Sequence, residues 1–312
     1  MGKELDMLQD DCGLDEIVDI ELDIDGKSMP PKNNKIALID ADTVAYTACL
    51  NVEVAGDVLG EEFYSDEEWQ EIINSKQYDA DEGLLYETCP IQALAKAEEK
   101  INRILDKTGC YDTELHFSGG RENFRYEVSP SYKANRTGRT PAGLSQLKKD
   151  LAKKYNGTIH TKWEADDIVV YLKELHKEKY IMCAIDKDVL NSVEGRHFNY
   201  YESGLYKIEM KWMDIDRYNS LTWRYLQTLM GDKTDNIIGL KGIGPAKAAK
   251  ILYGHTSHKL LWEAVCDAYK MKGRTIDEAL MNINLVDMKL LYLDESGELQ
   301  IKLRTHKELL ND

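Results

Sequence analysis

The chain has 312 residues, of which 43% are hydrophobic, and a formal net charge of −16 at pH 7. No apolar run approaches the roughly 20 residues that a membrane-spanning helix needs, so a membrane protein is not predicted. The six cysteines are scattered without a CxxC pair, which argues against a zinc site or a disulfide framework. The acidic N-terminus lacks the features of a secretory signal, so we expect a cytoplasmic protein.

The negative charge is segregated along the chain. Residues 1–30 carry 10 acidic residues against 2 lysines, and residues 51–82 carry 11 against 1. Residues 121–154, in contrast, hold 9 lysines and arginines against 3 acidic residues. A nucleic-acid partner, which the net charge alone would disfavour, is therefore compatible with the basic segment.

The first predicted elements follow an acidic extension, residues 1–34, which closes with Pro30 and Pro31. The apolar run "KIALID" (35–40) predicts a buried strand and "TVAYTACL" (43–50) a helix. Residues 51–88 are acidic and are interpreted as an insertion.

Helices and strands are then predicted in alternation. The expected helices are 91–109, 140–157 and 164–179, and the expected strands are 113–118, 158–163 and 180–186. In the second of these helices, Thr140 is the expected N-cap, Pro141 the first residue and Gly157 the stop. This alternation predicts an α/β fold with a mainly parallel central sheet flanked by helices, over residues 35–214.

The remaining residues, 215–312, are predicted to be mainly helical. A helix over 215–230 leads into "GDKTDNIIGLKGIGPAKAAKIL", which holds a glycine-rich turn before a helix that begins at Pro245. Glycines allow backbone amides to approach a phosphate, and a helix N-terminus adds a favourable field. The turn itself is weak evidence, because helix connections often need glycine.

Acidic side chains follow several of the predicted strands. Because parallel strands end at one rim of the sheet, we expect these side chains to converge there. They are Asp40 with Asp42, Glu164, Asp166, Asp167, Asp186 and Asp188, joined by Asp232 and Asp235 after the later helix. Taken singly, most of these residues could equally be helix caps, turn residues or first-turn acids.

So many carboxylates in a small volume would repel one another without a cation. No histidine or cysteine accompanies them, and an all-oxygen ligand set favours Mg²⁺ or Mn²⁺ over zinc. The cluster is rich enough for two ions about 4 Å apart, an arrangement that activates water and stabilises the leaving oxygen in phosphodiester cleavage.

The basic segment "NFRYEVSPSYKANRTGR" interleaves aromatic and cationic side chains. Cations bind phosphates and aromatic rings stack on unpaired bases, so this composition suits a single strand or a strand end, although a solvated basic loop remains an alternative. The candidate contacts here are Arg125, Tyr132, Lys133, Arg136 and Arg139, with Phe124 and Tyr126 as further aromatic residues.

In chain order, "LIDAD", "NFRYEVSPSYKANR", "WEADD", "AIDKD" and "GDKTDNIIGLKGIGPAKAAKIL" resemble the 5′-nuclease superfamily of flap endonucleases. The likeness is greatest to bacteriophage 5′ to 3′ exonucleases and to the 5′-nuclease domain of bacterial DNA polymerase I. It covers about residues 35–255. It implies a catalytic α/β domain over 35–214 and a DNA-binding region with a helix-three-turn-helix over 215–312.

The resemblance also implies a function. We expect a 5′ to 3′ exonuclease or 5′ flap endonuclease that acts on DNA with 5′ ends, flaps or nicks, and on the RNA of RNA-DNA hybrids. Phage DNA replication, primer removal or DNA degradation would be its setting, in the host cytoplasm, with replication proteins as further partners. Mg²⁺ is the expected cofactor in two sites, with Mn²⁺ as a substitute.

Site residues follow from the matched motifs. The resemblance assigns Asp40, Glu164 and Asp166 to a first metal and Asp186, Asp188 and Asp235 to a second, with Asp167 and Asp232 nearby. Lys133 and Arg136 match a basic pair that holds the scissile phosphate beneath a helical arch or clamp, here about residues 125–155. The implied duplex grip comprises Gly242, Gly244, Lys247 and Lys250, together with a K⁺ ion held by backbone carbonyls.

Three features depart from the family's pattern. Many relatives carry an aspartate where this chain has Ser118, so Asp42 or water is expected to compensate. The arch segment is short, and neither the acidic extension nor the insertion has an assigned counterpart.

Two other functions fit part of the sequence. "DADTV" (40–44) matches the Asp-x-Asp-x-Thr motif of haloacid-dehalogenase-type phosphatases, in which Asp40 would be the nucleophile. A non-catalytic DNA-binding relative is the second alternative, and Ser118 is its only support. Exonuclease against endonuclease preference, DNA against RNA preference and oligomeric state are not decided by the sequence.

Overall fold

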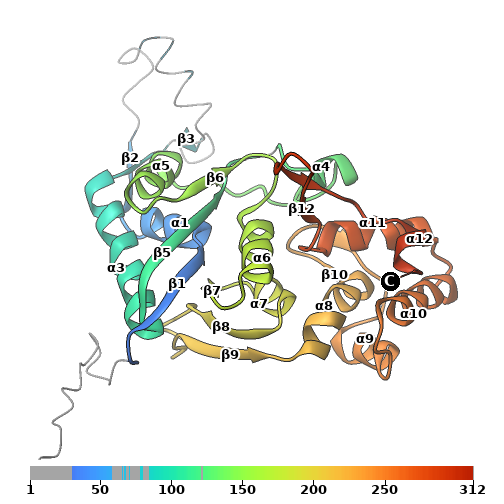
Figure 1. Cartoon of the computed structure of the whole chain (residues 1–312). Coiled ribbons are helices and arrows are strands. Elements are labelled where there is room, and N and C mark those ends of the chain that lie inside the picture. The colour runs from blue at the N-terminus through green and yellow to red at the C-terminus, as the bar shows by residue number, and fades with distance from the viewer. Residues whose placement is uncertain are drawn as a thin grey trace, which may run out of the picture.

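A computed structural model describes residues 30–57, 65, 67, 70, 78–79, 84–120 and 122–311. Its centre is a six-stranded sheet in the order β6-β5-β1-β7-β8-β9 (Figure 1). The strands are β1 (Asn33–Asp40), β5 (Cys110–Ser118), β6 (Thr158–His160), β7 (Tyr180–Ala184), β8 (Gly195–Asn199) and β9 (Lys211–Ile215). All neighbouring pairs are parallel except β8 with the edge strand β9. The predicted α/β fold with a mainly parallel sheet is therefore confirmed.

Helices cover both faces of this sheet. Helices α1 (Asp42–Leu50), α3 (Pro90–Thr108) and α5 (Leu144–Lys154) pack on one face, and α6 (Ala165–Leu175) and α7 (Lys187–Ser192) pack on the other. The one-turn helix α4 (Arg125–Val128) lies apart from them and contacts α11.

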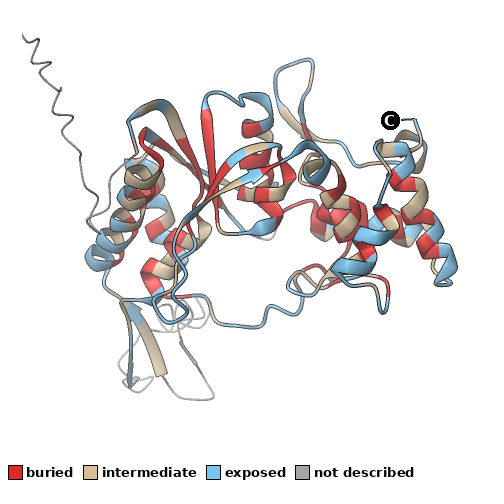
Figure 2. Cartoon of the chain, turned by 90° about the horizontal axis from the view of Figure 1, so that it is seen from below, coloured by how far each residue is buried: buried red, intermediate tan, exposed pale blue. Residues whose placement is uncertain are grey.

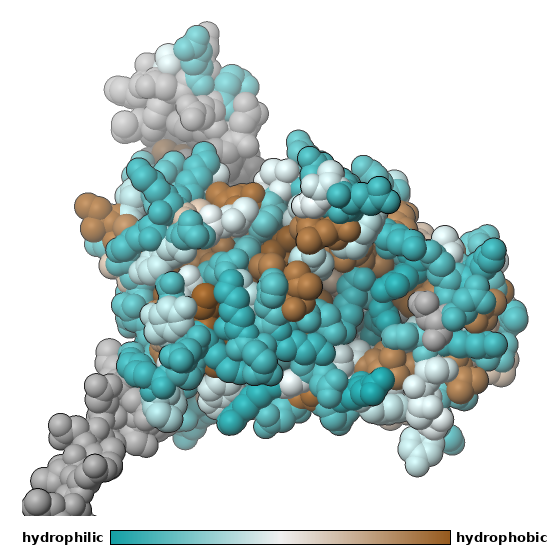
Figure 3. All heavy atoms as spheres, in the orientation of Figure 1, coloured by the Kyte–Doolittle hydropathy of each residue, from teal (hydrophilic) through white to brown (hydrophobic). Residues whose placement is uncertain are grey.

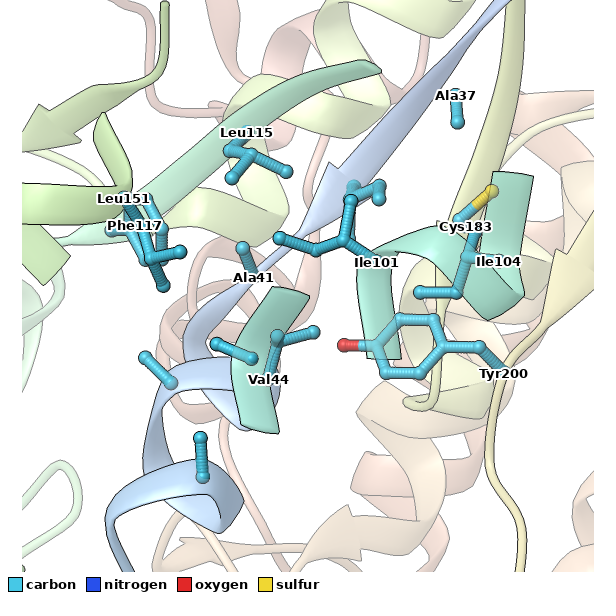
Figure 4. Packing of buried hydrophobic residues seen from close by; sticks show 14 of the residues in the cluster. Ala37, Ala41, Val44, Ile101, Ile104, Leu115, Phe117, Leu151, Cys183 and Tyr200 are labelled. Atoms are coloured by element: carbon cyan, nitrogen blue, oxygen red, sulfur yellow. The ribbon is translucent and has the colours of Figure 1, made fainter. Parts of the chain in front are cut away.

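The alternation of β1 side chains explains the two layers. Ala37 and Ile39 are fully buried against α1, α3 and α5, whereas Leu38 points to the opposite face and packs with residues of α6 and α7. Figure 4 shows the first of these layers, in which Val44, Ile101 and other apolar side chains converge between the helices and the sheet. A strand buried on both faces has to be continuously apolar, as "IALI" is.

A second core holds the C-terminal helices together. It is centred on the fully buried Trp262 and Tyr225, and the buried side of each helix faces its neighbours (red in Figure 2). The helices are α8 (Arg217–Met230), α9 (Pro245–Leu252), α10 (His258–Met271), α11 (Ile276–Val286) and α12 (His306–Leu309). Two short hairpins, β10 (Gly231–Asp232) with β11 (Ile237–Ile238) and β12 (Leu291–Leu293) with β13 (Leu299–Ile301), complete this part.

The acidic insertion contains a small sheet of its own. Its described strands are β2 (Glu53–Asp57), β3 (Tyr78–Asp79) and β4 (Leu84–Thr88), in the order β2-β4-β3 with antiparallel pairing. The acidic extension lies almost wholly outside the described residues, as does Arg121 of the basic segment.

Several predicted boundaries are wrong, and the predicted helix 164–179, for example, ends at Leu175. Helix α5 begins at Leu144 after Gly143, which has a left-handed backbone (φ 73°), so Thr140 is not an N-cap and Pro141 is not its first residue. Instead, the backbone N–H of Ala142 donates to Glu53, which draws this stretch away from helical geometry. Strand β6 ends at His160, three residues earlier than predicted.

No helix among the described residues is both long and apolar enough to cross a membrane. The face in Figure 3 is largely hydrophilic, with hydrophobic side chains in separate patches.

Candidate active site

The sheet has a topological switch point between its central strands β1 and β7. The connection that leaves β1 crosses the face covered by α1 and α3, whereas the connection that leaves β7 crosses the face covered by α7. Such a divergence opens a crevice beyond the carboxyl ends of the two strands, and ligands of open α/β sheets bind there. Asp40 is the last residue of β1, and Asp186 lies two residues after β7.

The N-termini of α6 and α7 bring further carboxylates to this crevice. Glu164 caps α6 in a capping box with Asp167, and Asp186 caps α7 by accepting the N–H of Asp188 at 2.7 Å. Capping therefore gives a structural reason for Glu164, Asp167 and Asp186. Asp166 is not a capping residue, and its carboxyl group lies within hydrogen-bonding reach of Asp40.

Asp167 belongs to a buried ion pair. The guanidinium of Arg125 donates to both of its carboxylate oxygens, at 2.7 and 2.6 Å, and each residue is at most 2% exposed. Arg125 also donates to the carbonyl of Leu285 in α11. The predictions of Asp167 as a metal ligand and Arg125 as a DNA contact are corrected accordingly, because the two charged groups are buried and paired with each other.

Lys133 and Arg136 also line the crevice. Lys133 Nζ lies 2.6 Å from Glu164 Oε1 and 3.7 Å from Asp235 Oδ2, and Arg136 Nη2 lies 2.5 Å from Asp235 Oδ1. Lys133 has a left-handed backbone (φ 53°), a conformation that costs a non-glycine residue about 1 kcal/mol or more and is held here by a hydrogen bond from its N–H to the Asp235 carbonyl. Such strain is typical of functional sites.

Tyr132 does not present its ring to a ligand. It is 2% exposed, and its hydroxyl group donates to Glu164 at 2.9 Å and lies 3.0 Å from Asp235. The predicted stacking of Tyr132 on a base is therefore corrected; the ring supports the two carboxylates. Asn123, which sequence reasoning missed, donates to Glu164 as well, and no motif distinguished it from a turn residue.

The crevice is a hollow of about 450 Å³, which we call the acidic hollow. Its charged lining comprises Asp40, Asp42, Glu164, Asp166, Asp186, Lys133, Arg136 and Lys187. A smaller adjoining space of about 30 Å³ shares Glu164, Asp166 and Asp186 with it and adds Asp188, Asp232 and Asp235. Eight of the nine acidic residues predicted to converge thus line one or other of these two spaces, and Asp167 is the exception.

Two groups can be distinguished among these carboxylates, one whose pKa is lowered by nearby cations and one whose pKa is raised by burial and neighbouring carboxylates. Burial alone would raise the pKa of Glu164, but Lys133 and Arg125 outweigh it and hold the pKa below its usual range. Burial and the nearby Asp42 carboxylate raise the pKa of Asp40 to about 7. Burial and the Asp186 carboxylate likewise raise the pKa of Asp188 to about 7. The pKa of Asp188 is raised although Lys187 is nearby, and among the described residues neither Asp40 nor Asp188 has a close ion pair like that of Glu164 with Lys133.

The donor set fits a hard divalent cation, although the side chains are not arranged as a finished coordination sphere. Within the described residues, no three Asp, Glu, His or Cys side chains are close enough together to form a metal-binding group. Asp188 Oδ1, however, is buried without a hydrogen-bond partner, and Asp166 has a pKa raised well above its usual range by burial and by Asp40. Desolvated, mutually repelling oxygens of this kind are what a bound Mg²⁺ or Mn²⁺ would stabilise.

Asp42 lies where the expected strand-end aspartate is replaced by Ser118. Its carboxylate accepts the Ser118 N–H at 3.1 Å and forms an ion pair with Lys148 of α5 at 2.6 Å. Lys148 also donates to the Ser118 carbonyl. A carboxylate thus reaches the end of β5 from α1, and Lys148 is a further site residue that the basic segment contained without any signal to single it out.

The remaining predicted DNA contacts lie on the surface. Gly242, with φ 79°, and Gly244 form the exposed turn before α9, and Lys247 Nζ donates to the Gly242 carbonyl at 2.9 Å. Lys250 is exposed on the same helix. Arg139 instead forms an ion pair with Glu53 and is only partly exposed.

The comparisons with known proteins confirm the predicted resemblance to the 5′-nuclease superfamily. Flap endonuclease Xni from a Shewanella species is 26% identical over 202 residues, which cover 60% of this chain and 75% of Xni. The thermostable DNA polymerase I of Thermus thermophilus is 30% identical over 174 residues, 52% of this chain. The chain spans only 20% of that polymerase's length.

Solved structures share the fold. T5 5′-exonuclease with bound divalent metal ions (zinc) matches with a TM-score of 0.54 at 18% identity, over 81% of this chain and 89% of that one. A bacteriophage T5 flap endonuclease variant, in a pseudo-enzyme-product complex with DNA and metal ions, matches with a TM-score of 0.50 at 16% identity over the same shares. No family model matches the chain.

Proposed function

We propose that this protein is a divalent-metal-dependent 5′ to 3′ exonuclease and structure-specific 5′ flap endonuclease that hydrolyses phosphodiester bonds in DNA. One observation carries the proposal. Carboxylates and the cationic side chains of Lys133 and Arg136 line the same hollow at the switch point of the sheet. The names of the relatives, a flap endonuclease and a 5′-exonuclease, support it.

Asp40, Asp166, Asp186 and Asp188 are the proposed metal ligands, because burial and neighbouring carboxylates raise the pKa of all four. Asp42, Glu164, Asp232 and Asp235 complete the set around them. Two Mg²⁺ ions, or Mn²⁺ in their place, would activate a water and stabilise the leaving oxygen. The zinc-bound relative supports a divalent metal in general.

Lys133 and Arg136 are proposed to hold the scissile phosphate. Both line the acidic hollow, and the Arg136 side chain is 53% exposed. In the free protein these cations neutralise Glu164 and Asp235. If they turned to an incoming phosphate, the two carboxylates would need the proposed metal ions as their new partners. Preorganised cations of this kind stabilise the charge that develops in the transition state.

Residues 35–214 are proposed as the catalytic domain and 215–312 as the DNA-binding region. The exposed turn at Gly242 and Gly244, with Lys247 and Lys250 on α9, suits the phosphate backbone of a duplex, and the helix-three-turn-helix assignment remains part of this proposal. A K⁺ ion at the turn would compete with Lys247, which already donates to the Gly242 carbonyl. Residues 125–155 are proposed to serve as the arch, although α5 itself packs on the sheet.

The phosphatase alternative has less support. It requires Asp40 as a free nucleophile, but Asp40 is 5% exposed and its carboxyl group contacts that of Asp166. It also leaves Lys133, Arg136 and the glycine turn without a role.

The decisive experiment uses 5′-labelled single-stranded, duplex, gapped, flap and RNA-DNA hybrid substrates with Mg²⁺, Mn²⁺ or EDTA. We expect release of 5′-terminal products or flaps with either metal and none with EDTA. Cleavage in EDTA, or digestion only from 3′ ends, would overturn the proposal. Trapping of aluminium fluoride on the enzyme without DNA cleavage would support the phosphatase instead.

A further inference from the structure

Lys133 and Arg136 sit on a segment that has little regular structure of its own. Residues 129–142, which we call the strap, run from the end of α4 to the turn before α5 as turns and extended chain. Ordering each residue of such a segment costs about 1–2 kcal/mol of conformational entropy. Its geometry therefore depends on what holds it at each end.

One end is fixed to the turn between β10 and β11. The contacts are hydrogen bonds from Lys133 N to the Asp235 carbonyl, from Asn135 Nδ2 to the Lys233 carbonyl and from Asn236 Nδ2 to the Ser131 carbonyl, at 2.9, 2.7 and 2.7 Å. This end holds the strap against the C-terminal part of the protein.

The other end is fixed by the acidic insertion. Glu53, the first residue of β2, accepts Arg139 Nη1 at 2.7 Å and the Ala142 N–H at 2.6 Å through Oε1, and its Oε2 pairs with Arg139 Nη2. The Glu53 side chain is only 4% exposed. A fork-to-carboxylate pair of this kind is directional and about twice as strong as a neutral hydrogen bond.

The neighbouring strand of the insertion completes the anchor. The guanidinium carbon of Arg139 lies 3.5 Å from the centroid of the Tyr86 ring in β4, within cation–π range. Glu53 and Tyr86 therefore hold one arginine between them, and both come from the small sheet β2-β4-β3.

We propose that Glu53 is a positioning residue, which through Arg139 fixes the strap and thereby aims Lys133 and Arg136 into the acidic hollow. The base of the insertion is then part of the active-site architecture, and Arg139 is a structural link rather than a DNA contact. The catalytic part of this inference depends on the proposed nuclease function. The anchor itself, meaning the contacts of Glu53 and Tyr86 with Arg139 and of Glu53 with Ala142, does not depend on that function.

The test compares Glu53→Gln, Arg139→Gln and the double variant with a matched control, Glu87→Gln, an exposed carboxylate on β4. Glu53→Gln keeps the side-chain shape and an acceptor for Ala142 but loses the ion pair. Hydrogen exchange over residues 136–142 reports the strap, and steady-state cleavage of a 5′-flap DNA reports the site. Thermal unfolding checks that each variant is folded.

Two results are expected. Exchange over 136–142 becomes about tenfold faster or more in Glu53→Gln, which corresponds to the loss of roughly one strong contact. The kcat falls about tenfold or more while KM changes by less than about threefold, because small misplacement of catalytic groups affects the transition state more than substrate binding. The double variant resembles either single variant, and Glu87→Gln behaves as the wild type.

Unchanged exchange in Glu53→Gln would overturn the anchor, whether or not the protein cleaves DNA. Faster exchange with a wild-type kcat would overturn the positioning role. Losses that add in the double variant would show that Glu53 and Arg139 act separately. Absence of cleavage by the wild type would overturn the nuclease proposal and the positioning role with it, while the exchange data would still decide the anchor.

Discussion

The ammonium group of Lys133 lies 2.6 Å from a carboxylate oxygen of Glu164, so the strap meets the N-terminus of α6 at the entrance of the acidic hollow. Burial alone would lower the pKa of Lys133, but Glu164 and Asp235 outweigh it and raise the pKa, which keeps the side chain charged. A permanent cation is thus held where a scissile phosphate is proposed to bind.

Replacing Lys133 by methionine should reduce the rate far more than DNA affinity. Loss of one preorganised charge at the reacting centre typically lowers kcat about 10²–10³-fold. Single-turnover cleavage in Mg²⁺ and duplex binding in Ca²⁺ would separate the two effects. Lys149→Met, an exposed position on α5, is the control. Equal losses of rate and affinity would contradict a role at the scissile phosphate.

Asp186→Asn should weaken metal binding without destabilising the fold. Asp186 increases the repulsion at Asp40, Asp166 and Asp188, so removing its charge should leave the metal-free protein equally or more stable. Calorimetric titration with Mn²⁺ should show loss of at least one binding event or a weaker one, and thermal unfolding in EDTA should show no decrease. Unaltered Mn²⁺ binding would exclude Asp186 as a ligand.

Asp167→Asn should have the opposite effects to Asp186→Asn: the protein should lose stability, and Mn²⁺ binding should not be directly weakened. Removal of one partner from a buried ion pair leaves Arg125 uncompensated and typically costs about 3–5 kcal/mol of stability. Urea unfolding would measure this loss, with Asp150→Asn on the surface of α5 as the comparison. A stable Asp167→Asn protein with impaired Mn²⁺ binding would restore the original prediction that Asp167 is a ligand.

Asp287 should make stability depend on pH in the acidic range. Burial alone would raise its pKa, but Arg224 and Arg304 outweigh it and lower the pKa from 3.8 to about 2. Because the folded pKa is the lower one, the contribution is complete above about pH 4 and is lost as the pH falls towards 2; a shift of this size corresponds to about 2 kcal/mol. The free energy of unfolding, measured by urea titration between pH 5 and 2.5, should fall less steeply in Asp287→Asn. An identical slope would contradict the assignment.

The order of β1, β5, β6 and β7 and of the helices between them was predictable because its signals are local. The apolar run before Asp40 is a buried parallel strand, and Gly109 ends α3 in a left-handed conformation. Convergence of the acids was predictable too, because the carboxyl ends of parallel strands share one rim. The start of α5 was mispredicted because the local signals at Thr140 and Pro141 are overridden by Glu53, which is 89 residues away from Ala142 in the chain.

The sequence by itself determined four strands of the central sheet, the helices between them and the acidic rim, since each follows from side-chain periodicity and strand direction. Strands β8 and β9 were not predicted. Only the tertiary structure decided which charged side chains pair with one another inside the protein. Arg125 and Asp167, Arg139 and Glu53, and Lys148 and Asp42 pair across 42, 86 and 106 residues of chain, so no local pattern reports them. Long-range packing decides whether a charge faces solvent or an opposite charge. Asp167 and Glu53 are thereby buried in ion pairs of the fold, whereas Asp42, although paired with Lys148, still lines the acidic hollow and stays in the proposed metal set.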